Sequence, residues 1–206
     1  EAVQLLSEAL AQQDNLSTRT ALGMALAATG RATDAAREFR RVLGQDSARP
    51  DAAFHLAGLL VGPLAGDNDA QRLGTTRKAE ALYRSALKVR PEWAEAHFNL
   101  GATLLNQHRF EEVLDTVGHA LELAAPKAPW RPEALRVLEI ARSRLPSGTR
   151  FPRARTDAIR PFDLRLSRTG PERDICAQPV TRAGRIPFDH KTAFSIRRPG
   201  NACPDH

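Results

Sequence analysis

The chain has 206 residues, of which 42% are hydrophobic and 26% are charged, and its formal net charge at pH 7 is +6. This length allows one large or two small domains. No apolar run approaches the roughly 18 residues that a bilayer-spanning helix requires. The two cysteines do not form a CxxC pair and indicate neither a zinc site nor a disulfide framework.

The chain begins at Glu1, in the middle of a repeat and without a methionine, and it shows no signal-peptide pattern. We therefore expect an upstream part to be absent. This leaves the cellular compartment open, with the cytoplasm as the default.

In chain order, residues 1–13 are an amphipathic segment that contains a two-residue signature, and this signature returns three times. The signatures lie 33, 44 and 34 residues apart: Ala9-Leu10, Val42-Leu43, Ala86-Leu87 and Ala120-Leu121. A second anchor, leucine before a small residue, recurs with steps of 34 and 44 residues: Leu22-Gly23, Leu56-Ala57 and Leu100-Gly101. Both anchors place the same ten-residue excess between residues 60 and 79, which predicts a chain built from repeated helix pairs.

The excess falls in residues 62–76, within the second complete helix pair. Pro63, three glycines and several polar residues predict a protruding loop here between the two helices. Residues 67–69, Asp-Asn-Asp, begin like a calcium-binding loop. The later glycine is missing, and Lys78 stands where such a loop has a bidentate glutamate, so we expect a solvated loop without calcium.

The last helix pair is predicted over residues 92–106 and 110–123. Pro91 suits the start of a helix because its fixed φ is helical and its missing N–H would be unpaired there. Gly101 and Ala120 are small enough to let the two backbones approach closely. Helices this short are marginal alone in water, so they need neighbours, and this favours a stacked array.

Residues 128–145 predict one more amphipathic helix with no partner helix after it, as expected of a terminal cap. Residues 1–145 carry 18 Lys and Arg against 18 Asp and Glu, whereas residues 146–206 carry 12 against 6. The second segment also holds eight of the 14 prolines and both cysteines, Cys176 and Cys203. Its composition predicts a disordered tail.

The helix pairs resemble the tetratricopeptide repeat, whose pattern is W-x2-L-G-x2-Y, then A-x3-F, then P, on a period of about 34 residues. The matching segments are His97-x2-Leu100-Gly101-x2-Leu104, Arg19-x2-Leu22-Gly23-x2-Leu26, Ala35-x3-Phe39, Ala79-x3-Tyr83 before Pro91, and Val113-x3-Val117. The first-position tryptophan is absent throughout, and Val117 replaces the expected aromatic residue. The resemblance covers about the first 125 residues.

The resemblance implies an all-α protein, a right-handed α-solenoid of stacked helix-turn-helix repeats with a C-terminal capping helix and a disordered tail. The expected parts are a repeat domain over residues 1–145 and a tail over 146–206. Within the repeat domain we expect a half repeat over 1–15, repeats over 16–49, 50–91 and 94–125, and a cap helix over 128–145.

The function that the resemblance implies is a non-catalytic scaffold or adaptor that binds a peptide or helix of another protein in its concave groove. The alternative is a docking or oligomerisation segment of a larger enzyme, for instance a transferase, whose catalytic domain lies outside this chain. First helices line the groove in this family, and the residues carried over are Thr20, Met24, Asp51, Phe54, Val61, Glu95, Phe98, Asn99, Leu105 and Asn106.

Phe54 and Phe98, together with Met24, Val61 and Leu105, are expected to form an apolar floor for such a peptide. The alternative for the two phenylalanines is that they pack between repeats as core. A clamp for a partner's terminal carboxylate is disfavoured, since only Asn99 and Asn106 fit one.

No motif for nucleotide binding, a nucleophilic serine or a zinc protease occurs in the chain. The six histidines are scattered and are expected to be edge or turn residues. We therefore predict no catalytic residue, no metal site and no cofactor. Nucleic acid is disfavoured as a partner because the arginines of residues 146–206 are spaced apart and interrupted by six acidic residues.

Overall fold

The structure is a computed structural model that describes residues 1–146. This part of the chain consists of eight α-helices and contains no strand. The helices are α1 (Ala2–Gln12), α2 (Leu16–Ala28), α3 (Ala32–Gln45), α4 (Pro50–Val61), α5 (Asp69–Val89), α6 (Ala94–Leu105), α7 (Phe110–Leu123) and α8 (Arg131–Ser143). Apart from Pro146, the predicted disordered tail lies outside the described residues.

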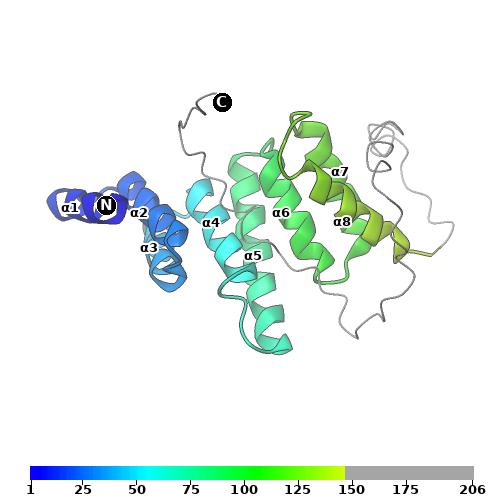
Figure 1. The fold of residues 1–206 in the computed structure, drawn as a ribbon, viewed down its shortest axis with the longest axis horizontal. Coiled ribbons are helices and arrows are strands. Elements are labelled where there is room, and N and C mark those ends of the chain that lie inside the picture. The colour runs from blue at the N-terminus through cyan, green and yellow to red at the C-terminus, as the bar shows by residue number, and fades with distance from the viewer. Residues whose placement is uncertain (147–206) are drawn as a thin grey trace, which may run out of the picture.

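The helices follow one another in a single row, from α1 at one end to α8 at the other (Figure 1). The closest pairs are α2 with α3, α4 with α5, and α6 with α7, and each pair also packs on the next. The first helices α2, α4 and α6 touch one another in turn, and α8 contacts both α6 and α7 as the first helix of a further pair would. The predicted all-α solenoid with a C-terminal capping helix is therefore confirmed.

The core is a thin line that runs along the row, and the A-x3-F pattern marks where it passes through the second helices. Phe39 of α3, Tyr83 of α5 and Val117 of α7 stand at the same register and are fully buried. Each lies among the side chains of one connected hydrophobic cluster that extends from α2 to α8. Because these positions meet the first helix of their own pair, they hold the pairs together.

Two glycines let first and second helices approach closely. A Cβ atom on Gly23 would lie 2.6 Å from Cε1 of Phe39, and one on Gly101 would overlap Cγ2 of Val117. The space of the missing side chain is thus filled by a residue of the partner helix. The prediction that Gly101 marks a close approach of two backbones is confirmed.

The predicted loop over residues 62–76 is wrong in its second half. Only residues 62–68 lie outside helices, and α5 has 21 residues where α3 and α7 have 14 each. Asn68 caps α5, since its side chain accepts a hydrogen bond from the backbone N–H of Gln71 at 2.8 Å. The Gln71 side chain in turn accepts one from the N–H of Asp67 at 2.9 Å. These two hydrogen bonds form a reciprocal cap, which lets α5 begin at Asp69 and continue through Gly74. Most of the ten-residue excess therefore extends α5.

The remaining loop is fastened to the first turns of α5. The Thr75 hydroxyl donates to the carbonyl of Ala65 at 2.8 Å, and the Arg72 guanidinium donates to the carbonyl of Gly66 at 3.1 Å. Among residues 1–146, no group of three or more His, Cys, Asp or Glu side chains is placed to hold a metal ion. No helix of this part is long and apolar enough to cross a bilayer.

Candidate peptide-binding groove

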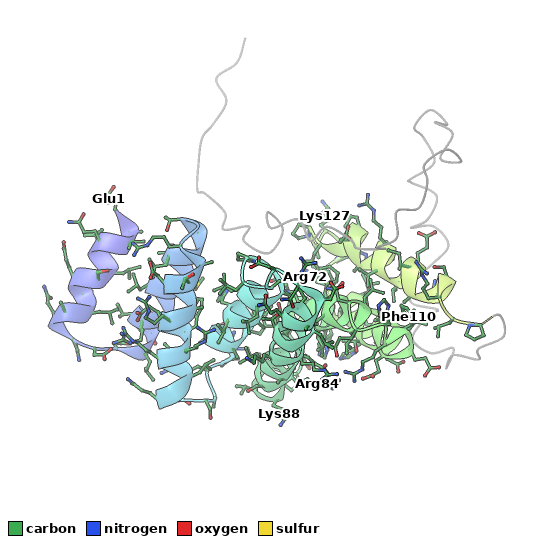
Figure 2. All side chains as sticks on the ribbon, turned by 90° about the horizontal axis from the view of Figure 1, so that it is seen from below. Glu1, Arg72, Arg84, Lys88, Phe110 and Lys127 are labelled. Carbon is green, nitrogen blue, oxygen red and sulfur yellow. The ribbon has the colours of Figure 1, made fainter. Side chains whose placement is uncertain are left out.

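The inner faces of α2, α4 and α6 form the candidate groove, since these first helices lie next to one another along the row. The second helices stand behind them. Figure 2 views the row from below, with Arg72 labelled near the N-terminal end of α5 and Arg84 and Lys88 near its C-terminal end.

The ten predicted groove residues differ in exposure. Thr20 and Met24 on α2, Asp51 and Val61 on α4, and Glu95 on α6 are partly exposed, whereas Phe54, Phe98, Asn99 and Leu105 are buried and Asn106 is exposed. The partly exposed residues offer surface to a ligand. The buried ones shape the face from beneath.

The two phenylalanines stack on tryptophans that sequence analysis missed. Phe54 stacks on Trp93 with ring centroids 4.4 Å apart, and Phe98 stacks on Trp130 at 5.1 Å. Trp93 and Trp130 occupy the N-cap positions of α6 and α8, so each aromatic pair joins one first helix to the next. With Phe54 5% exposed and Phe98 6% exposed, these rings pack between units. The signal in the sequence is a tryptophan directly before two successive first helices.

Asp51 is engaged by an arginine at the end of the second helix of its pair. The Arg90 guanidinium donates to both carboxylate oxygens of Asp51, at 2.7 and 3.0 Å, and also lies over the Trp93 ring, 5.2 Å from its centroid. Arg90, Trp93 and Phe54 thus form a layered contact between α4 and the connection before α6. All the charged groups in this layer are open to solvent, so the ion pair positions side chains more than it stabilises the fold.

Three polar groups between α4 and α6 have no hydrogen-bond partner among residues 1–146. The Tyr83 hydroxyl is fully buried and unpaired, and it lies 3.7 Å from where a Cβ atom on Gly58 would stand. The Glu95 carboxylate is partly buried, and burial raises its pKa. Asn99 as a residue is 7% exposed. Buried polar groups are normally paired, so these three are candidates for contact with a ligand.

Polar groups between the second helices are satisfied by contrast. The Glu80 carboxylate of α5 accepts hydrogen bonds from Arg109 at 2.8 Å, Gln107 at 2.8 Å and Arg84 at 2.9 Å. Burial by itself would raise the pKa of Glu80, but these three donors outweigh it and the pKa is lowered. Elsewhere among the described residues, the one other buried side-chain atom without a hydrogen-bond partner is Nε of Arg19 on α2.

The histidines of the described part serve packing. His55 lies against the rings of Phe39 and Phe54, and burial lowers its pKa, which favours the neutral form. His97 meets His119 edge to face at 4.7 Å, and its Nε2 donates to the carbonyl of Pro91 at 2.7 Å.

No family model and no curated protein matches the sequence. Among solved structures, the chain is similar to the MamA protein, with a TM-score of 0.58 and 16% sequence identity over 81% of this chain and 80% of that one. It is also similar to SycD, a type III secretion translocator chaperone of Yersinia enterocolitica, with a TM-score of 0.50 and 18% identity over 64% of this chain and 83% of that one.

A second SycD structure, solved in complex with a peptide of the translocator YopD, gives a TM-score of 0.51 at 19% identity, over 64% of this chain and 95% of that one. MamA and SycD are tetratricopeptide-like helical-repeat proteins, so the likeness confirms a tetratricopeptide-like fold. At identities this low it concerns the fold alone.

Proposed function

We propose that this chain is a non-catalytic scaffold of the tetratricopeptide family that binds a peptide or helix of another protein along α2, α4 and α6. One observation carries the proposal. The inner face combines partly exposed apolar side chains, Met24 and Val61, with polar groups that have no partner among the described residues, Glu95 and Asn99. Peptide grooves need both, because apolar pockets supply affinity and open hydrogen-bond groups fix the backbone and register.

The fold similarity supports the same proposed function, peptide binding. SycD, which shares the arrangement of helices, has been solved with a peptide of YopD bound. A row of short helix pairs offers a long concave surface, and such a surface suits an extended or helical ligand.

The test is selection of binders from a random 12-residue peptide library displayed on phage, with the full chain as bait. We expect Val61→Glu to lower the affinity of selected peptides by about tenfold or more, because it places a charge at the end of α4 on the inner face. Val89→Glu is the matched control, since Val89 is an exposed valine at the end of α5.

Circular dichroism of both variants should show an unchanged helix content. Equal loss of binding in both variants would place the binding surface elsewhere. Failure to select any peptide that Val61→Glu weakens would contradict the proposed function.

A further inference from the structure

Gly58 leaves a gap on the inner face of α4, and the floor of this gap is polar. The one atom found near the position of its missing Cβ is the Tyr83 hydroxyl oxygen, at 3.7 Å. Tyr83 comes from the second helix α5, and its ring meets Phe54 edge to face with centroids 5.7 Å apart. The hydroxyl thus reaches the groove from behind, is fully buried, and has no hydrogen-bond partner. Leaving such a group unpaired costs free energy that a bound ligand would recover.

The next first helix, α6, contributes a carboxylate whose charge acts on Tyr83. Glu95 lies in the first turn of α6, two residues after Trp93, and the Trp93 ring stacks on Phe54. The pKa of Tyr83 is raised by burial and, second, by the charge of Glu95, so the two groups are close enough to interact. Glu95 makes no hydrogen bond and no ion pair within residues 1–146, whereas the neighbouring Asp51 is held by Arg90.

We propose that the groove recognises a lysine or arginine of a partner protein's peptide at a subsite formed by Gly58, Tyr83 and Glu95. This inference rests on the proposed function and names the chemistry of its ligand. A basic side chain lays its methylene stem across Gly58 and donates hydrogen bonds to the Glu95 carboxylate and the Tyr83 hydroxyl oxygen. A charged donor compensates the half-buried carboxylate, which a neutral polar side chain would leave without a counter-charge.

The structure also defines what this subsite excludes. An acidic side chain would meet Glu95 with like charge, and an aliphatic one would leave the buried Tyr83 hydroxyl unpaired. The subsite therefore acts on specificity, and the apolar side chains beside it supply surface for affinity.

The test uses the random 12-residue phage library with the full chain as bait. We expect the selected peptides to share a lysine or arginine at one position. Synthetic peptides of the selected sequence, with that residue or with norleucine in its place, are then titrated against the variants. Glu95→Gln should weaken the basic peptide by about tenfold or more and should leave the norleucine peptide almost unchanged.

Glu111→Gln is the matched control, because Glu111 is an exposed glutamate in the first turn of α7 and its loss changes the net charge equally. Gly58→Leu fills the gap and should also weaken the basic peptide, whereas Gly58→Ala fits the available space. Circular dichroism verifies that each variant keeps its fold.

Selected peptides without a common basic residue, or equal binding by Glu95→Gln, would overturn this inference and leave the proposed function standing. Selected peptides that match this chain's residues 147–206 would replace the partner protein by the chain itself. Absence of any peptide that Val61→Glu weakens would remove both the inference and the proposed function.

Discussion

At the scale of single residues, two helical glycines have opposite surroundings, although each lies in the middle of a first helix. Gly101 faces Val117 so closely that a Cβ atom would overlap it, whereas the nearest atom to a Cβ on Gly58 is 3.7 Å away. We expect Gly101→Ala to destabilise the fold by about 1–3 kcal/mol through overpacking. Gly58→Ala should stabilise it by about 0.5–1 kcal/mol through helix propensity. Urea unfolding midpoints measure both effects, and a loss of stability in Gly58→Ala would show that its gap is not free space.

The sequence predicts one of these glycines well and is silent on the other. Gly101 follows a leucine at a position that Gly23 and Ala57 share on the repeat period, so its role in a close approach of helices could be predicted. Gly58 is simply the next residue after that anchor in its own unit. The gap at Gly58 depends on where the side chain of Tyr83, on the second helix, ends. No spacing along the chain encodes that geometry.

At the scale of helices, the tryptophan–phenylalanine stacks connect one pair to the next. Phe98 stacks on Trp130 with a 5.1 Å centroid separation and an 8° angle between rings, and it is 6% exposed. We expect Phe98→Ala to lower the free energy of unfolding by about 3–5 kcal/mol, as for other buried aromatic truncations. Leu73→Ala is the control, since Leu73 is 44% exposed on α5 and its loss should cost little.

A double-mutant cycle with Trp130→Ala separates the stack from general burial. We expect a coupling energy of about 0.5–1.5 kcal/mol between the two rings beyond their area burial. Purely additive losses would mean that Phe98 and Trp130 pack independently. If Phe98→Ala left stability unchanged and reduced only peptide binding, Phe98 would belong to the groove surface.

Helix boundaries show how local signals compete in sequence interpretation. The bounds of α7 are predicted correctly because Phe110, Val113 and Val117 keep a regular helical spacing. The start of α5 is missed because three glycines and Pro63 in residues 62–76 outweigh a short capping signature, Asn68-x-x-Gln71. In the structure α5 begins at this cap, because its additional N-terminal turns are also held to the loop by the hydrogen bond from Thr75.

At the scale of the whole molecule, the order of the helices follows from the repeat period, because each unit can bury its apolar face only against its neighbours. The polar subset of the groove could not be predicted in the same way. Glu95, Asn99 and Tyr83 are ordinary residues for their positions, and only the folded arrangement shows that nothing among residues 1–146 satisfies them. The repeat period and the hydrophobic pattern therefore predict the helical scaffold, whereas the packing of side chains in the folded chain decides which polar groups a ligand can meet.

The same nearest-neighbour logic predicts unequal stability along the row. Within residues 1–146, α1 packs mainly on α2 and contains no buried residue, and Leu5 on it is 59% exposed. Leu6 stands at the register of Phe39 and Tyr83 but is only partly buried, because no first helix among the described residues covers it. We expect amide hydrogens of α1 to exchange on the order of a hundredfold or more faster than those of α4–α7.

Hydrogen–deuterium exchange followed by mass spectrometry measures this gradient in the full chain. Leu6→Ala should accelerate amide exchange in α1 and α2 and leave exchange in α6 and α7 almost unchanged. Phe39→Ala should accelerate amide exchange in α2, α3 and α4. Equal protection of α1 and α6 would contradict the prediction, because it would require the eight helices to open as one unit. A graded profile would mean that the α4–α6 face, which carries the candidate subsite, lies in the part of the array that opens least.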